Sequence, residues 1–251
     1  SMSAPGAEHE REEGLVTHLV ELRARLVRAV LAVMLVFVAL LPFAQRIYAQ
    51  FAQPLLEKLP AGGQIIAIDV ASPFFAPIKL AFFAALVIAM PAVLYQLWAF
   101  VAPGLYRHEK KLAMPLLVSA VVLFYLGIVF AWFAVLPLVF GFLTAVTPEG
   151  VAMMTDINRY LDFVLLMFMA FGLSFELPVA VVVMAALGWV EVEQLKAARP
   201  YVIVGIFVLA AVITPPDMVS QIMLAVPMIL LYELGIIAAR MVVRGSADAT
   251  T

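Results

Sequence analysis

Six long apolar runs constrain the fold of this chain more than any other feature of its sequence. A helix needs about 20 apolar residues to cross the hydrocarbon core of a bilayer, and only helices and closed barrels satisfy their own backbone hydrogen bonds there. The runs lie at 26–44, 78–101, 113–136, 162–187, 201–213 and 218–239. Hydrophobic residues make up 66% of the chain and charged residues 13%, too few to cover a soluble surface. We therefore predict an all-α membrane protein with six transmembrane helices, a single domain over 1–251 with polar tails at 1–16 and 244–251.

The distribution of Lys and Arg predicts the orientation. An even number of spans puts both termini on one side, and the side richer in Lys and Arg is the cytoplasm. Eleven cations fall on one side and four on the other; the eleven are Arg11, Arg23, Arg25, Arg28, Arg107, Lys110, Lys111, Lys196, Arg199, Arg240 and Arg244. Both termini are therefore expected in the cytoplasm, with 45–77 and 144–161 as ordered caps on the outer side.

Prolines and one short run predict the shape of the helices. Prolines lie in or at the ends of the apolar runs, at Pro42, Pro91, Pro115, Pro137, Pro178 and Pro227. Each removes a backbone hydrogen bond, so five of the six helices are expected to bend, although prolines are also simply commoner in membrane helices. Residues 201–213 span only roughly 20 Å, and Thr214-Pro215-Pro216-Asp217 ends that helix sharply. The last two helices should form a hairpin that ends inside the membrane or thins it.

Several classes of chemistry are missing from the sequence. It has no cysteine, and His9, His18 and His108 all lie outside the apolar runs. A zinc site of the His-Glu-x-x-His type, an intramembrane histidine base and a glycine-rich phosphate loop are absent. We therefore expect neither an enzyme nor a bound metal or cofactor, and the net charge of −2 argues against nucleic acid. Residues 3–13 are polar and acidic, so no removable signal or transit peptide is expected.

Three polar residues in the apolar runs need an explanation. Glu176 lies near the middle of the fourth run, where an ionised carboxylate costs roughly 2.5–3.5 kcal/mol. It is either a polar point on a concave surface or a protonated acid bonded to a backbone carbonyl freed by a proline. Gln221 suits an interhelical hydrogen bond, with a partner helix or within the chain. Glu233 is expected to pair with Arg240 or to face a cavity, in a structural role.

Two acids lie in basic segments that flank the runs. Glu21 and Arg25 are four residues apart in an amphipathic stretch, 18–26, that leads into the first run. Their simplest role is an i,i+4 pair on a helix. Glu109 lies in the loop 105–111 among four potential cations and could simply neutralise part of that charge.

Seven segments of the sequence resemble those of a known protein family. They are His18-Leu-Val-Glu21-Leu-Arg23, Asp69-Val-Ala-Ser-Pro73-Phe-Phe75, Tyr95-Gln-Leu-Trp98-Ala-Phe100-Val-Ala-Pro103-Gly-Leu-Tyr106, His108-Glu109, Phe171-Gly-Leu-Ser-Phe-Glu176-Leu-Pro178, Arg199-Pro200-Tyr201 and Thr214-Pro-Pro-Asp217. With them the chain resembles, from about residue 17 to 243, the TatC family, the multi-spanning receptor subunit of the twin-arginine protein translocase. Several of these segments are loops, which chance similarity between apolar helices would not reproduce.

The resemblance implies a fold and a function. Members of the family are cup-shaped proteins of six helices in the bacterial cytoplasmic (inner) membrane, with both termini in the cytoplasm. They bind signal peptides with paired arginines and export folded proteins with the proton-motive force. Single-span partners, TatA and TatB, take part, and the chain is expected in an oligomer of translocase subunits surrounded by membrane lipid.

The resemblance also assigns the site residues. Glu21 and Glu109 would receive the two arginines, with Phe100 beside them and Arg23 in the same segment. The other assignments are Glu176 to the concave interior, Gln221 to the contact with partner helices, and Pro54, Pro73 and Asp217 to the outer cap. Planar guanidinium groups pair bidentately with carboxylates, so two fixed acids would select a pair of arginines.

Two other function classes remain open from the residues alone. The first is a transporter of small molecules, in which Glu176 would bind the coupling ion. The absence of a convincing internal repeat and the acids in the basic segments speak against it. The second is a structural scaffold that holds other membrane helices.

Overall fold

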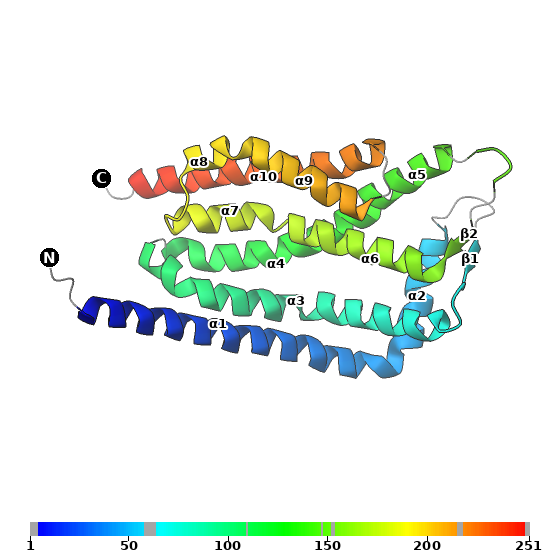
Figure 1. Ribbon diagram of the computed structural model, residues 1–251, viewed down its shortest axis with the longest axis horizontal. Helices are drawn as coiled ribbons and strands as arrows, with labels where there is room; N and C mark the ends of the chain where they lie inside the picture. The colour runs from blue at the N-terminus through cyan, green and yellow to red at the C-terminus, as the bar shows by residue number, and fades with distance from the viewer. Residues whose placement is uncertain are drawn as a thin grey trace.

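The computed structural model describes residues 5–57, 64–108, 110–146, 148–151, 154–214 and 218–248. Within them the chain is a helical bundle whose one sheet is a short two-stranded ladder (Figure 1). The helices are α1 (Pro5–Leu40), α2 (Ala44–Glu57), α3 (Ser72–His108), α4 (Ala113–Phe130), α5 (Leu136–Val146), α6 (Ile157–Ser174), α7 (Leu177–Ala186), α8 (Val192–Ala197), α9 (Arg199–Ile213) and α10 (Met218–Asp248). Shorter pieces are the 3₁₀ turns η1 (Leu41–Phe43) and η2 (Lys110–Leu112), the π-helical turn η3 (Ala131–Val135), and the strands β1 (Gln64–Ile66) and β2 (Met154–Asp156).

Five helical stretches in the described residues are long and apolar enough to cross a membrane. They are His9–Gln53, Pro73–His108, Lys110–Val146, Asn158–Ala186 and Met218–Asp248. They contain five of the six predicted runs, which confirms a multi-pass helical protein. The sixth run corresponds to α9, which is apolar but has only 15 residues. A full set of six spans therefore depends on α9 and stays a prediction.

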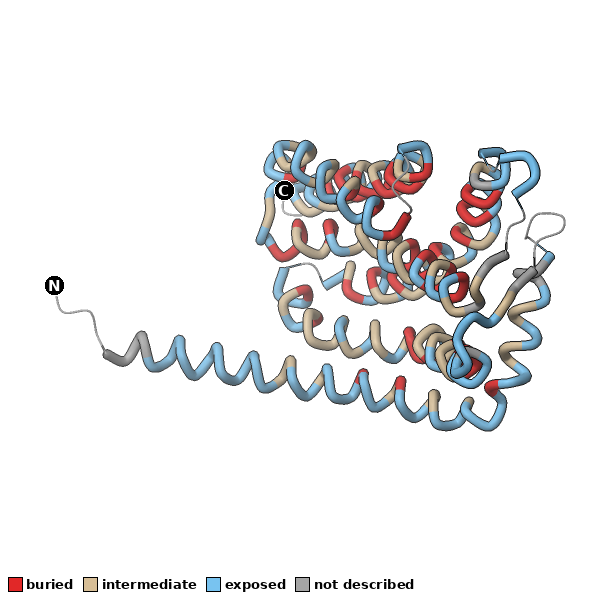
Figure 2. Tube along the Cα trace, turned by 45° about the vertical axis from the view of Figure 1, so that its right-hand side comes forward, coloured by how far each residue is buried: buried red, intermediate tan, exposed pale blue. Residues whose placement is uncertain are grey.

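The first helix is longer than its apolar run. Residues 5–16, which we expected to be part of a polar tail, form the first turns of α1. Residues 9–16 project beyond the rest of the bundle (Figure 2). A proline in the first turn and acids in the next turns suit a helix N-terminus, because they fit its fixed φ and its positive dipole end. At the other end of the chain, residues 244–248 continue α10.

Three of the six prolines singled out in the sequence lie where one helical segment gives way to the next. Pro42 lies in η1 between α1 and α2, Pro137 follows η3 at the start of α5, and Pro178 begins α7. Pro91 and Pro227 lie inside α3 and α10, which continue through them. The sixth is in the first turn of α4, where a helix tolerates a missing N–H.

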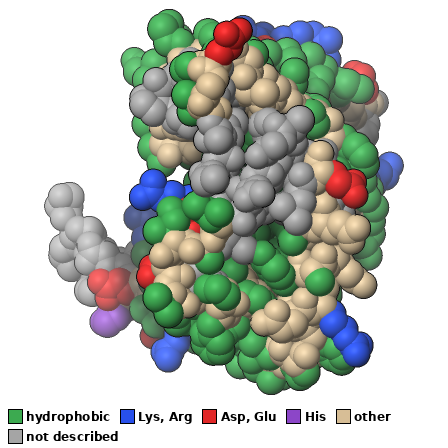
Figure 3. All heavy atoms as spheres, turned by 90° about the vertical axis from the view of Figure 1, so that its right-hand side faces the viewer, with side chains coloured by type: hydrophobic (Ala, Val, Ile, Leu, Met, Phe, Trp, Pro, Cys, Tyr) green, Lys and Arg blue, Asp and Glu red, His purple; other side chains and the backbone are tan. Residues whose placement is uncertain are grey.

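The two termini lie at one end of the bundle, and the strands lie at the opposite end (Figure 1). There β1 pairs with β2 in parallel, with Gln64 opposite Met154. The Lys79 Nζ donates to Asp162 Oδ1 at 2.7 Å, which joins α3 to α6. Within the described parts of 45–77 and 144–161 the chain is thus ordered. Figure 3 looks onto this end, where hydrophobic side chains cover much of the described surface and charges of both signs are scattered.

Close packing between α4 and α6 depends on two glycines. Lipid tails are as apolar as side chains, so helices associate in membranes largely through small residues that let backbones approach. A Cβ built on Gly127 would lie 2.4 Å from the Phe171 carbonyl oxygen, and one on Gly172 would lie 2.8 Å from the Phe124 ring. Phe124 and Phe171 are completely buried at this contact.

We expect Gly127→Ala to lower the thermal midpoint of the detergent-solubilised protein. The added methyl meets backbone, which cannot rotate away, and overpacking of this kind costs about 1–3 kcal/mol. Gly141→Ala is the matched control, because a Cβ there meets no heavy atom within 4 Å and alanine favours a helix. A Gly127→Ala protein that melts at or above the temperature of the parent would contradict this account of the α4–α6 contact.

Candidate functional site

The first candidate surface lies where α1 and α3 meet, at the end of the bundle that carries the termini. The helices pack along each other, and the rings of His18 and Phe100 lie 4.4 Å apart between centroids, tilted by 36°. Glu21 follows His18 by about one turn on α1. The fold thus brings the segment of Glu21 beside Phe100, although the two residues are 79 positions apart in sequence.

Glu21 is held loosely and keeps room for a ligand. Its side chain is 43% exposed, and its Oε1 lies 3.9 Å from an Arg25 guanidinium nitrogen, which is beyond hydrogen-bond reach. The predicted i,i+4 pair is therefore present but weak, since exposed pairs of this kind stabilise a helix by a few tenths of a kcal/mol. Arg25 also donates to Gln96 Oε1 at 3.1 Å, which ties α1 to α3. The carboxylate of Glu21 can still accept hydrogen bonds from an incoming guanidinium.

Arg23 and Glu109 are the other two residues predicted for this surface. Arg23 is exposed on α1. Glu109 lies outside the described residues; its neighbours His108 and Lys110 end α3 and begin η2. The Nδ1 of His108 lies 2.9 Å from the Gly104 carbonyl oxygen.

Glu176 sits at the break between α6 and α7. Phe175 and Glu176 form a turn there, in which the Glu176 N–H donates to the Leu173 carbonyl at 3.0 Å. The break follows from Pro178, which has no N–H to donate to the turn before it. The proline thus determines where the helix breaks, and Glu176 lies at that break.

The Glu176 side chain lies between two clefts that are almost wholly apolar. One, of about 610 Å³, is bounded by Leu173, Val202 and other residues of α6, α7, α9 and α10. The other, of about 350 Å³, lies toward Trp98 on α3 and Leu116 on α4. Glu176 Oε1 is buried and has no hydrogen-bond partner within the described part of the chain. Of the two explanations from sequence, the bond to a freed backbone carbonyl is not made by this atom.

The hairpin of α9 and α10 places the last predicted polar residue. The 15 residues of α9 rise about 22 Å, which is shorter than a hydrocarbon core of about 30 Å. Thr214 at its end is buried and donates from Oγ1 to the Ala210 carbonyl at 2.6 Å. Gln221 is half-buried in the first turn of α10.

The predicted outer cap residues are Pro54, Pro73 and Asp217. Pro73 is exposed in the first turn of α3. Pro54 lies in α2, but its side chain is outside what the structure describes, and so is all of Asp217.

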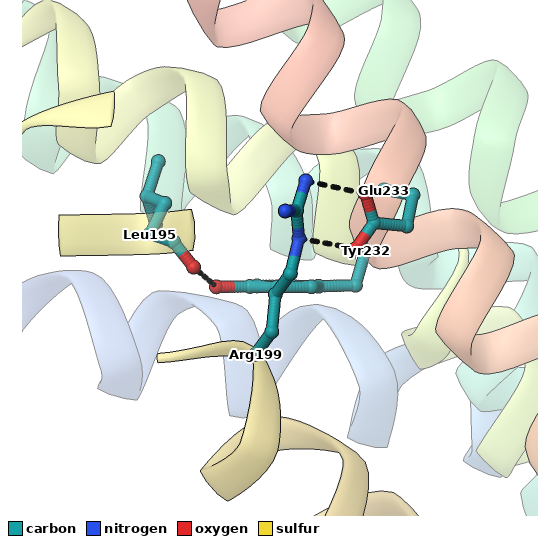
Figure 4. A network of polar contacts seen from close by, with 4 residues as sticks. All are labelled: Leu195, Arg199, Tyr232 and Glu233. Atoms are coloured by element: carbon teal, nitrogen blue, oxygen red, sulfur yellow. Dashed lines mark hydrogen bonds and ion pairs between the residues drawn. The ribbon is translucent and has the colours of Figure 1, made fainter. Parts of the chain in front are cut away.

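A polar network joins α8, α9 and α10 near the end that carries the termini (Figure 4). Arg199 donates from Nε and from a terminal nitrogen to the two carboxylate oxygens of Glu233, at 2.8 and 2.9 Å. The Tyr232 hydroxyl donates to the Leu195 carbonyl at 2.5 Å. Glu233 therefore pairs with Arg199 and not with Arg240, because α9 packs directly on α10 whereas seven residues along one helix separate two side chains by about 10 Å.

Sequence reasoning missed this pair and the one between Lys79 and Asp162. Both join residues far apart in the chain, 34 and 83 positions, so no local spacing signals them. The single acid of the last run was the available hint, since an ionisable residue in a membrane helix usually has a partner. Among the described residues, no group of three or more His, Asp or Glu side chains is placed to hold a metal ion.

Comparisons with known proteins agree with the fold. A family model described as Sec-independent protein translocase protein (TatC) matches residues 17–227. The chain is 57% identical over 227 residues to the translocase protein TatC of Azotobacter chroococcum mcd 1, with 90% of this chain and 89% of that protein covered. It is 52% identical over 231 residues to TatC of Escherichia coli K12, with 92% and 90% covered. A crystal structure of the twin-arginine translocase receptor TatC superposes with a TM-score of 0.80 at 36% identity, with 89% of this chain and 98% of that chain covered.

We expect the Arg199–Glu233 pair to stabilise the α9–α10 contact by about 1 kcal/mol, because its geometry is bidentate but both side chains are more than a third exposed to screening. A double-mutant cycle with Arg199→Gln, Glu233→Gln and both changes together measures the coupling from thermal or denaturant unfolding. The Glu193–Lys196 pair, in which Glu193 is exposed and both residues lie in one helix, is the control and should couple more weakly. A coupling free energy of zero between Arg199 and Glu233 would show that the pair does not stabilise the α9–α10 contact.

Proposed function

We propose that this chain, which belongs to the TatC family of Sec-independent protein translocase proteins, is the receptor subunit that binds signal peptides with paired arginines. The observation that carries the proposal is the half-exposed, loosely held carboxylate of Glu21, about one turn from the contact of His18 with Phe100, in a chain whose solved relative is described as a translocase receptor. The relatives are components of a protein translocase, so the family is a transport family and not an enzyme family.

The charges and the fold support a particular membrane arrangement. The chain is a multi-pass membrane protein. We place it in the bacterial inner membrane as a single domain, with α9 as a short sixth span and both termini in the cytoplasm. The excess of Lys and Arg at the end that carries both termini supports this orientation.

Binding of the arginine pair needs two fixed acids. We assign one to Glu21, on α1 where that helix packs against α3, and the second to Glu109, one residue beyond the end of α3. Among the described residues, the ion pair that such an arginine would displace from Glu21 is the 3.9 Å contact to Arg25. Two carboxylates select two guanidinium groups over ammonium groups, because a carboxylate accepts two parallel hydrogen bonds from arginine but not from lysine.

The two clefts beside Glu176 suit either a partner helix or the part of a signal peptide that follows the paired arginines. The two clefts are apolar apart from this acid and Ser174, so a hydrophobic segment can fill them and a polar group on that segment can meet the unsatisfied Oε1. Such a segment would be carried across at the expense of the proton-motive force. A small-molecule transporter, in which Glu176 binds a coupling ion, is less well supported because the relatives are protein translocase proteins.

Single-span partners of the TatA and TatB type are assigned to the α9–α10 hairpin. Val204, Val208 and Val212 form an exposed apolar stripe on α9. The half-buried Gln221 lies near the end of this stripe, at a depth where a short helix leaves a polar side chain accessible. Leu224, in contrast, is completely buried and cannot take part in such a contact.

Removing one acid should weaken peptide binding. We expect Glu21→Gln and Glu109→Gln each to reduce the affinity of a synthetic Arg-Arg signal peptide roughly 10- to 150-fold, since a charged hydrogen bond contributes about 1.5–3 kcal/mol. Fluorescence anisotropy of a labelled peptide on the purified protein measures this loss. Glu13→Gln, two turns earlier on the same exposed face of α1, is the matched control and should bind like the parent. Parent-like binding by both Glu21→Gln and Glu109→Gln would overturn the clamp, as would equal binding of a Lys-Lys peptide.

Photo-crosslinking tests the assignment of the partners. A photoreactive residue at Val204 or Val208 should capture TatA- or TatB-like proteins in membranes, because these positions are exposed on the short helix. Positions 35 and 38 on α1, equally exposed and apolar, are the controls and should capture few. Equal capture at α1 and α9 would count against the hairpin as the docking surface.

A further inference from the structure

A basic cleft lies between α8 and the last turns of α10, apart from the sites described above. It has a volume of about 300 Å³ and is lined by Val192, Glu193, Lys196, Arg240, Val243 and Arg244. Three cations therefore surround it against one acid.

The depth of the cleft matches the headgroup layer of a bilayer. Arg240 lies seven residues beyond Glu233, a rise of about 10 Å past the charged pair at which the short helix α9 begins. Trp189 and Tyr201, which precede and follow α8 in the chain, are 70% and 82% exposed. Exposed aromatic residues of this kind gather at membrane interfaces. The cleft thus opens where phosphate groups lie.

The charges of the cleft are not balanced by the protein. Lys196 pairs with Glu193 at 2.9 Å, and that contact, with smaller effects of Arg240 and Arg199, lowers the pKa of Glu193. Neither Arg240 nor Arg244 forms an ion pair with an acid in the described ranges of the chain. They are four residues apart on one helix face, and like charges at this spacing destabilise a helix. An anion between them would remove this repulsion.

We propose that the α8–α10 cleft binds the phosphate of an anionic membrane lipid through Lys196, Arg240 and Arg244. The half-buried Arg240 and the exposed Arg244 offer forked N–H groups that suit phosphate oxygens, and Val192 and Val243 give the lipid an apolar wall. Basic pockets between helices on the cytoplasmic side of membrane proteins bind such headgroups. The site is separate from the α1–α3 surface, so it does not depend on signal-peptide binding.

Native mass spectrometry of the detergent-solubilised full chain tests the site. The parent should bind one phosphatidylglycerol more tightly than phosphatidylcholine. The Arg240→Gln/Arg244→Gln double variant should bind it roughly 30-fold more weakly, given the attraction of each cation to an anionic lipid surface. Lys110→Gln/Lys111→Gln removes the same charge from exposed positions at the same end of the bundle and should bind like the parent. If the double variant is unstable, Arg244→Gln alone serves in its place, because it removes only an exposed side chain. It should bind the lipid with an affinity between those of the parent and the double variant.

Three outcomes would overturn the proposal. The first is equal loss in the two double variants, which would mean that net charge alone attracts lipid. The second is equal binding of phosphatidylglycerol and phosphatidylcholine by the parent. The third is equally tight binding of glycerol phosphate, which would make the cleft a site for soluble phosphate. Retention of lipid by an Arg240→Lys/Arg244→Lys protein, at reduced affinity, would support the role of charge at these positions.

Discussion

The need to satisfy every backbone hydrogen bond without water governs this structure. In hydrocarbon an unpaired N–H or C=O costs several kcal/mol, so the chain is helical almost throughout and departs from the helix only at particular places. Two of those places lie beside polar residues of the apolar runs. The break between α6 and α7 presents Glu176, and the end of α9 leads into Thr214 and toward Gln221. Proline causes the first break, because it removes a donor where the apolar sequence would otherwise continue the helix.

Packing between the helices relies on close approach and on polar ties, since lipid offers no hydrophobic driving force of its own. Gly127 lets α4 touch the backbone of α6 near the middle of the bundle. Toward the ends, Lys79 with Asp162 and Arg199 with Glu233 join helices that are distant in sequence. These ion pairs lie where water and headgroups can solvate charge. In the apolar middle the helices are held mainly by close packing. This division leaves the clefts beside Glu176 as apolar surface that the chain itself does not fill.

The apolar runs predicted the helices and even the unusual brevity of α9, because length and hydropathy depend on local sequence alone. The extent of α1 was not predicted, since residues 5–16 are polar and their helicity comes from capping and charge near the helix start. The partner of Glu233 was also missed, because it is decided by which helices touch. The segment of Glu21 was brought beside Phe100, but the roles of these residues rest on the resemblance and not on their pattern.

Because α1 is long, its acidic residues lie at different distances from the membrane surface. In the proposed arrangement, with Leu40 at the outer boundary of the hydrocarbon, about 30 Å at 1.5 Å per residue reaches back to about Glu21. The acidic turns that contain Glu12 and Glu13 then stand roughly 12 Å or more farther out. That is beyond the Debye length of about 8 Å at physiological salt, so the field of the anionic leaflet is largely screened there. In the proposed arrangement Glu21 therefore lies near the lipid phosphates, whereas Glu12 and Glu13 lie in bulk electrolyte, where salt screens them from both.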